Sequence, residues 1–320
     1  MASQNVQISP PHGWAVMRRN RVAMLSLFVL ILLSLVSLVG PMMLPESLKS
    51  TGDMPFLPPG SGQHFLGTDV NGQDLFYRLL SGGRVSLGIG CAGAFLSLVI
   101  GTLYGMISGY AGGRIDALMM RAMDIMQSIP RILLIMILTA ALDGHLKSML
   151  DAARLWAQNA HWATIEGLFR DAIPYSRILV MILSLGIVEW IEMARMVRGQ
   201  VLVLREMTFI AAARAMGQTP WGVLKKHLLP NLSTIIITYL TLAIPTVILD
   251  ESILSFLGLG IDDPAASWGS LLRDGSQVIN PIDSKWWLLV FPSLCMSLGL
   301  LALNFLGDGL RDFFDPKSAD

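Results

Sequence analysis

The sequence predicts an all-α membrane protein that crosses the bilayer with six transmembrane helices. Hydrophobic residues make up 53% of the 320 residues and charged residues only 14%, a balance typical of multi-pass membrane proteins and not of water-soluble domains. The apolar residues also gather in runs of about 20 with few charges, the length that one helix needs to cross the hydrocarbon layer. The formal net charge is zero, so nothing indicates a nucleic-acid partner.

The chain begins with a polar tail and one apolar run. Residues 1–21 are polar and end in a cluster of arginines, which favours a cytoplasmic location for this tail. Residues 22–44 follow as the first predicted transmembrane helix. This run is longer than the apolar part of a secretory signal peptide, and no small-residue cleavage site follows it. Residues 45–84 are rich in proline and in turn-forming residues, so we expect a periplasmic loop there.

Residues 85–306 form the predicted transmembrane core, with five further transmembrane helices. The apolar runs are 85–109, 115–142, 178–197, 232–257 and 286–306. Residues 143–176 mix charged and apolar residues at helical spacing, so we expect a periplasmic, amphipathic insertion on the membrane surface. Residues 199–231 hold a dense group of Lys and Arg, which predicts a cytoplasmic loop. Residues 307–320 are a polar tail, which we also expect in the cytoplasm.

Three glycines in the second apolar run predict close helix packing. Gly101, Gly105 and Gly109 follow one another at four-residue spacing. This spacing places them on one face of a helix, where the absence of side chains lets a second helix approach. We therefore assign these glycines a role in helix packing.

The cytoplasmic loop is predicted to fold as two short helices. Residues 207–216 contain several alanines and no helix breaker. Gly217 can adopt the left-handed conformation that ends a helix, and Pro220 suits the first turn of a second one. We expect that second helix to run to Leu229 and to stop at Pro230. A helix–turn–helix held between two transmembrane helices indicates a docking element.

Two charged residues inside an apolar run are further candidates for function. Asp250 and Glu251 are flanked by apolar residues on both sides, and ionisable side chains in such places usually face the bundle interior or a water-filled path. Two interpretations stay open. They are a gate or pore-lining pair on a translocation path, or a pair near the outer end of the helix that bonds to neighbouring helices.

Two pairs of opposite charges lie three residues apart on predicted helices. They are Arg121 with Asp124, and Glu192 with Arg195. Residues at this spacing are neighbours on a helix surface, so we expect each pair to form within its own helix.

The sequence contains none of the short motifs that mark common catalytic or metal sites. There is no G-x-x-x-x-G-K-[ST], C-x-x-C, H-E-x-x-H or G-x-S-x-G. We therefore expect no catalytic residue, no metal site and no cofactor in this chain. Transport driven by ATP would need an ATPase on another polypeptide.

The cytoplasmic loop resembles the EAA loop of ABC-transporter permeases. The resemblance rests on A-A-A-R-A-M-G at residues 211–217 and H-L-L-P at residues 227–230. In that family the loop forms a coupling helix that lies in a groove of the ATPase subunit, and Ala211 stands where the family has glutamate. The resemblance implies ATPase-coupling contacts for these residues of the loop: Glu206, Phe209, Ala211, Ala212, Ala213, Arg214, Gly217, His227, Leu229 and Pro230.

Further motifs extend the resemblance over nearly the whole chain except residues 143–176. They are G-T-D-V-N-G-Q-D (67–74), M-A-R-M-V-R-G-Q (193–200), L-S-F-L-G-L-G (254–260) and S-W-G-S-L-L-R-D-G (267–275). The chain is similar to the peptide-type permeases of ABC importers. This implies the type I importer permease fold and a multi-pass location in the bacterial inner membrane, with both termini in the cytoplasm.

The resemblance also implies a function and partners. Such a permease forms the translocation path for oligopeptides or dipeptides together with a second permease subunit. It receives peptide from a periplasmic or lipid-anchored binding protein and couples to two ATPase subunits, which carry ATP and Mg. It contacts membrane lipid and no nucleic acid. Nickel chelates, antimicrobial peptides or sugars stay open as related substrates. A secondary transporter is less favoured because the sequence shows no inverted repeat, and a membrane receptor subunit is the remaining alternative.

Overall fold

The computed structural model describes residues 20–49, 52, 54–160, 162–261, 263, 265–280 and 283–314. Over these residues the chain is mainly helical, and its only extended pairings are two isolated bridges in the loop before α4. The predicted all-α class is confirmed. Most of the predicted tail 1–21, and the last part of the predicted tail 307–320, lie outside the described residues.

Five helical runs are long and apolar enough to cross a membrane, by length and composition. They are α2 (Arg21–Met43), α4 (Leu75–Ala111), α6 (Arg131–Asn159), the run from α10 (Pro220–Val223) through α11 (Leu229–Phe256), and α13 (Trp287–Phe314). A further helix, α8 (Ser176–Leu204), is as long as α6 but has charged residues within its apolar stretch, and it packs against α4. With α8 included, the structure has the six long helices that the sequence predicts.

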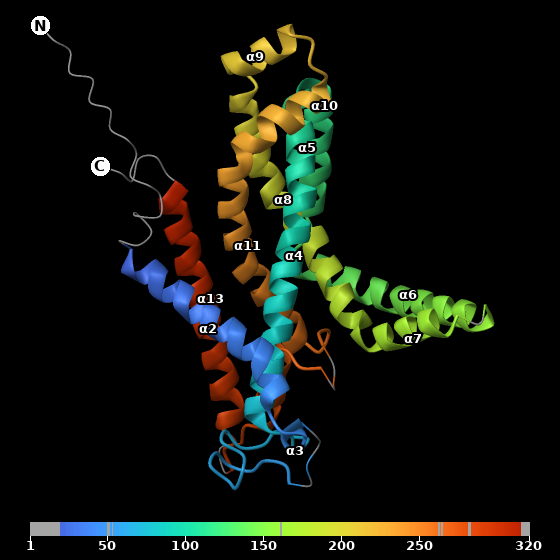
Figure 1. The fold of residues 1–320 in the computed structure, drawn as a ribbon, viewed down its shortest axis with the longest axis vertical. Coiled ribbons are helices and arrows are strands. Elements are labelled where there is room, and N and C mark those ends of the chain that lie inside the picture. Colours follow the sequence, from blue (N-terminus) through green and yellow to red (C-terminus); the bar gives the residue numbers. More distant parts are fainter. Residues whose placement is uncertain are drawn as a thin grey trace, which may run out of the picture.

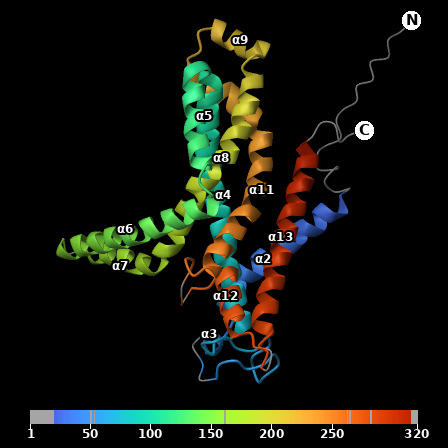
Figure 2. The same cartoon turned by 180° about the vertical axis from the view of Figure 1, so that it is seen from behind.

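The bundle is elongated, and its two ends carry different structures (Figure 1). One end holds α9 (Thr208–Ala215) and α10, and we call it the α9 end. The other end holds α3 (Glu46–Lys49), the loop before α4, and α12 (Trp268–Val278), and we call it the α12 end. Figure 2 shows α2 crossing α13 and α4 on one flank, where these helices are in contact.

α4 and α8 form the closest helix pair in the bundle. A Cβ atom built on Gly101, Gly105 or Gly109 would lie 2.7, 2.5 or 3.0 Å from a backbone carbonyl oxygen of α8. Real side chains do not fit at such distances, so glycine is needed at these three positions, where α8 packs directly on the backbone of α4. The predicted loop 45–84 ends earlier in the structure, because α4 begins at Leu75 and continues without a break through the predicted helix 85–109.

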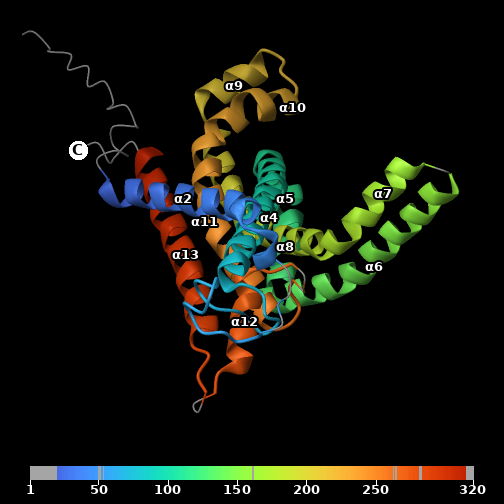
Figure 3. The ribbon, with the colours of Figure 1, turned by 60° about the horizontal axis from the view of Figure 1, so that its bottom comes forward.

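The predicted third transmembrane helix, residues 115–142, is broken in the structure. α5 (Gly113–Gln127) ends before Pro130, whose ψ of 126° is extended, and α6 begins at the next residue. Proline disfavours the helical conformation in the residue before it, which explains why the break falls here. α6 then leaves the bundle and packs against α7 (Ala163–Ala172), and together they form a projecting arm (Figure 3).

The predicted insertion, residues 143–176, maps onto this arm. It covers the second half of α6, all of α7 and the 3-10 turn Ile173–Tyr175. The rings of Trp156 and Trp162 meet edge to face at 5.2 Å between centroids, and Arg154 lies 3.6 Å from Glu166. These contacts join the two helices of the arm near its tip.

α12 is a helix that the sequence analysis does not predict, because it lies between the apolar runs 232–257 and 286–306. Ser267 and Ser270 form a capping box: each side-chain oxygen accepts a hydrogen bond from the backbone N–H of the other residue. Trp268 is buried, and its indole Nε1 donates to the carbonyl oxygen of Leu79 at 3.3 Å. The S-x-x-S spacing was the available signal for the start of this helix.

Candidate functional site

The turn after α9 takes its shape from Gly217. This residue has φ of +79°, in the left-handed region that favours glycine. The backbone N–H of Gln218 donates to the carbonyl of Ala213 at 3.2 Å, and that of Gly217 donates to the carbonyl of Arg214 at 3.0 Å. This pair of bonds is the common way for a helix to end at glycine. Pro220 then begins α10, as predicted.

The inner face of α9 is anchored on the ends of three long helices. Ile210 and Ala213 are fully buried. They share one apolar cluster with residues of α4, α8 and the α10–α11 run, namely Met106, Met193, Val197, Val201, Val223, Leu224, Leu228 and Leu232. Because such interiors are close-packed and stiff, a displacement of α9 is passed to α8 and α11 together.

The outer face of α9 and α10 exposes large apolar side chains. Phe209, Met216 and Trp221 are 40%, 75% and 59% exposed, and Ala211 and Ala212 are exposed beside them. We call these five residues the outer patch. An exposed apolar surface of this kind at an end of the bundle indicates a site of interaction with another protein or with the membrane.

The other predicted residues of this loop stabilise the turn or lie at its surface. The Arg214 guanidinium lies 4.8 Å from the centre of the Tyr110 ring, a cation–π contact between α9 and the end of α4. His227 Nε2 lies 3.1 Å from Oε1 of Gln218, which closes the turn. The remaining three, Glu206, Leu229 and Pro230, are exposed.

The prediction that Pro230 stops the second short helix is wrong. A π-helical turn, Leu224–Leu228, follows α10 and leads directly into α11, with Pro230 in the first turn of α11. Proline is compatible with a first helical turn, and the wider π-turn changes the hydrogen-bond register just before it. α10 and α11 therefore form one helical run from the outer patch into the bundle.

A partly buried ion pair ties the first turn of α5 to α8. Both carboxylate oxygens of Asp116 accept from the Arg198 guanidinium at 2.6 Å, and Ser108 Oγ donates to Asp116 at 2.5 Å. Arg205 Nη1 donates to the carbonyl of Gly109 at 2.9 Å. Sequence reasoning did not single out Asp116. Its signal was an aspartate directly after the G-G-R-I turn that ends an apolar run.

The prediction that Asp124 pairs with Arg121 is wrong. Asp124 instead lies 2.9 Å from Arg195 of α8. Arg195 is thereby engaged away from Glu192, the partner that the sequence predicts for it. This contact joins two helices, whereas each predicted pair lies within one helix.

Asp250 lies in a shared ion network in the middle of the bundle. Arg131, the first residue of α6, places Nη2 2.8 Å from Asp250 and Nη1 3.1 Å from Glu189 of α8. Asp250 is 3% exposed. The network joins α6, α8 and α11 where α6 leaves the bundle. Glu189 was not among the predicted site residues.

Glu251 is fully buried among hydroxyl groups. It accepts hydrogen bonds from Ser86 at 3.1 Å and from Ser255 at 2.7 Å, and Ser86 in turn accepts from the backbone N–H of Trp268 at 3.1 Å. These bonds connect α4, α11 and α12. The surroundings of Asp250 and Glu251 favour bonding to neighbouring helices, and a place on the translocation path stays a prediction for both.

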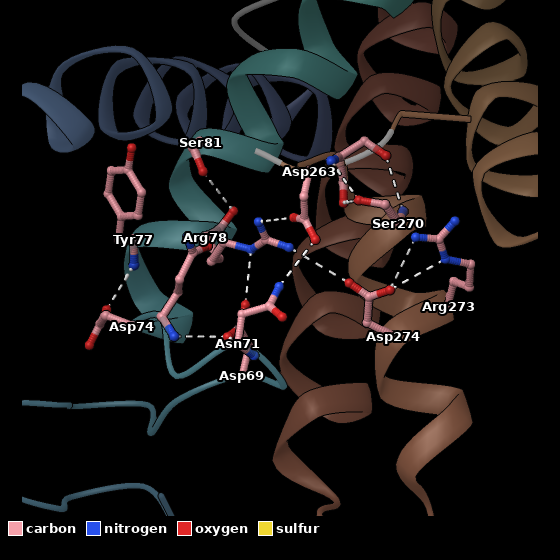
Figure 4. Close-up of polar contacts among 12 residues, drawn as sticks. Asp69, Asn71, Asp74, Tyr77, Arg78, Ser81, Asp263, Ser270, Arg273 and Asp274 are labelled. Atoms are coloured by element: carbon pink, nitrogen blue, oxygen red, sulfur yellow. Dashed lines mark hydrogen bonds and ion pairs between the residues drawn. The ribbon is translucent and has the colours of Figure 1, made fainter. Parts of the chain in front are cut away.

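A second charged cluster holds the α12 end together (Figure 4). Arg78 of α4 is 2% exposed. Its guanidinium lies 3.1 Å from Asp69, 2.6 Å from Asp263 and 3.7 Å from Asp274. The loop before α4, the loop after α11, and α12 thus meet on one arginine. The nearby carboxylate of Asp74 caps α4 by accepting from the N–H of Tyr77 at 2.9 Å.

Two guanidinium groups face three carboxylates in this cluster: Arg78 contacts all three, and Arg273 also contacts Asp274 at 3.3 Å. Burial raises the pKa of Asp69 above its usual range, and the charge of Arg78 only partly opposes this effect. Burial also raises the pKa of Asp274, against the opposing charges of Arg273 and Arg78. The cluster is therefore short of positive charge, and its stability depends on Arg78.

Comparison with known proteins defines the class. Residues 101–320 match the family described as "Binding-protein-dependent transport system inner membrane component", and residues 12–59 match "N-terminal TM domain of oligopeptide transport permease C". The chain is 38% identical over 301 residues to the oligopeptide transport system permease protein OppC of Haemophilus influenzae, covering 93% of this chain and 86% of that protein.

Two further relatives agree. The chain is 36% identical over 306 residues to the dipeptide transport system permease protein DppC of Bacillus subtilis, covering 95% of this chain and 85% of that protein. It is 37% identical over 321 residues to the oligopeptide transport system permease protein OppC of Escherichia coli K12, covering 98% of this chain and 95% of that protein. The chain belongs to the family of binding-protein-dependent transport system inner membrane components. The resemblance to peptide-type permeases is thereby confirmed.

A solved structure shares the fold. One chain of the inward-facing MetNI methionine ABC transporter aligns with a TM-score of 0.50 at 20% sequence identity, covering 75% of this chain and 98% of that chain. This likeness confirms the ABC permease fold. With its several apolar helices and its family membership, the chain is a multi-pass protein of the inner membrane.

Proposed function

We propose that this chain is the membrane-spanning permease subunit of an ATP-driven importer of peptides. The outer patch is the observation that carries the proposal. An exposed apolar surface at an end of the bundle, anchored on α8 and α11, suits a second protein that moves these helices. The names of the relatives, oligopeptide and dipeptide permeases, support peptides as the substrate class.

The proposed partners follow from this role. The outer patch docks an ATPase subunit, so the α9 end lies in the cytoplasm, together with both chain termini. Lys225 and Lys226 are exposed beside the outer patch, and such basic residues are typical of the cytoplasmic side of a membrane protein. A second permease subunit completes the translocation path, and a binding protein delivers peptide at the α12 end. ATP and Mg are held by two ATPase subunits, and this chain is not an enzyme.

The proposed mechanism is alternating access. Closure of the ATPase dimer displaces α9, and the cluster around Ile210 and Ala213 moves α8 and α11 with it. The ion pair between Asp116 and Arg198 passes the motion to α4 and α5. The bundle then opens at the α12 end to receive peptide.

The first test replaces Gly217 with valine. A β-branched residue at φ of +79° costs about 1–3 kcal/mol, so α9 loses its defined end. We expect peptide uptake by the reconstituted complex to fall at least about fivefold, while ATP hydrolysis continues. The matched control is Gly199→Val in α8, where an added Cβ has nothing within 4 Å. Unchanged coupling in Gly217→Val would refute the proposed function.

A further inference from the structure

Two glutamates of α8 lie between two cavities in the middle of the bundle. Glu189 and Glu192 both line a cavity of about 160 Å³ between α4, α8 and α11, which Tyr239 also lines. Both also line a cavity of about 250 Å³ between α5, α6 and α8, which includes Arg131. The two carboxylates therefore border open space on both sides of α8.

The depth of Glu192 argues against contact with lipid. It lies about 24 Å from the first residue of α8 and about 18 Å from the last, at 1.5 Å per residue. Its side chain is nevertheless exposed on this chain. A carboxylate at such a depth is costly in hydrocarbon and faces a water-filled path or another protein instead. This flank of α8 therefore borders the translocation path or the subunit that completes it.

The charges around Glu192 are not balanced. Arg131 contacts both Glu189 and Asp250. Among the described residues Glu192 has no ion-pair partner, and it accepts one long hydrogen bond, 3.5 Å, from the hydroxyl of Tyr239. Oδ2 of Asp250 is also buried, and it has no hydrogen-bond partner among the described residues. Arg131 is thus shared by Glu189 and Asp250, and Glu192 beside them has no cation among the described residues, so the site can accept a further cation.

We propose that Glu192, assisted by Tyr239 and Glu189, binds an ammonium group of the peptide during its passage. This assignment rests on the proposed function and names the part of the substrate that the path recognises. The ammonium group can be the amino terminus or a lysine side chain. Leu98, Leu240 and Ala243 line the same cavity and suit the apolar remainder of a peptide.

The experiment measures uptake by the complex reconstituted with its partner subunits in vesicles. The probes are a tripeptide with a free amino terminus and no basic side chain, its N-acetylated form, and an N-acetylated peptide with one lysine. The variants are Glu192→Gln and Glu192→Asp, with Glu166→Gln on the arm as the matched control. ATP hydrolysis is recorded in parallel, since it reports whether each complex is assembled and coupled.

We expect Glu192→Gln to lower uptake of the free tripeptide about tenfold, as for loss of one charged hydrogen bond. Glu192→Asp keeps most of the uptake because the charge remains, and the acetylated peptide is unaffected. A loss for the acetylated lysine peptide extends recognition to side chains, and no loss restricts it to the amino terminus. Equal losses for the free and acetylated tripeptides, or no loss for either, would overturn the proposed ammonium site and leave the proposed function standing. A wild-type complex that imports no peptide would overturn the proposed function as well.

Discussion

Leucine in place of Gly105 should prevent formation of a stable bundle. A Cβ atom there would lie 2.5 Å from the carbonyl oxygen of Ala194, 2.9 Å from Cβ of Val197 and 3.0 Å from the backbone nitrogen of Arg198. Backbone atoms cannot move aside as the end of a side chain can. The cost should therefore reach at least about 3 kcal/mol, the upper part of the range for overpacked sites. Recovery of monodisperse protein after detergent extraction, and its thermal unfolding, measure the effect.

The matched control lies on the same helix. Gly88 of α4 is exposed, and a Cβ built on it meets nothing within 4 Å. Gly88→Leu should therefore be recovered in normal amounts with an unchanged unfolding temperature. If Gly105→Leu and Gly88→Leu behave alike, α4 and α8 do not pack as described.

The second large effect is expected at Arg78. Arg78→Met leaves the buried carboxylate of Asp69 without its cation, while Asp274 keeps Arg273, and loss of one partner from a buried ion pair costs about 3–5 kcal/mol. We expect a lower unfolding temperature and rapid proteolysis of the loop before α4. Arg84→Met is the matched control, because Arg84 lies on the same helix and is exposed.

The loss in Arg78→Met should depend on pH. A carboxyl group whose pKa is raised in the folded protein takes up a proton on folding, so its folded form gains stability as pH falls. Burial already raises the pKa of Asp69 and Asp274 with Arg78 present. The destabilisation should therefore shrink as the pH is lowered from neutral toward these raised values. A loss that is constant with pH would contradict the charge-based account of this cluster.

Features set by local sequence were predicted well. The first transmembrane helix follows from one uncharged apolar run, and α2 matches it closely. Gly217 and Pro220 fix the turn between α9 and α10 through their own backbone preferences. In such cases the residue and its neighbours decide the conformation, so a single sequence is sufficient.

Features set by long-range contacts could not be predicted. Asp124 has a basic residue three positions away in its own helix, yet it pairs with Arg195 of α8 because α5 and α8 lie side by side. The three partners of Arg78 come from separate segments that meet only in the folded bundle. Glu192 stands out only when its exposure is combined with its depth along α8. None of these relations leaves a periodic signal in the sequence.

The most direct test of the account is a disulfide cross-link from α9 to an ATPase subunit. Met216→Cys places a thiol in the outer patch at a position that is 75% exposed, after Cys91 and Cys295 are replaced by alanine. We expect Met216→Cys to form a disulfide cross-link with cysteines introduced across the surface of the co-expressed ATPase. We expect no cross-link from Met149→Cys on the arm. We also expect Met216→Cys to react with membrane-impermeant reagents only from the cytoplasmic side. Labelling of Met216→Cys from the periplasm, with no cross-link to the ATPase, would contradict the account.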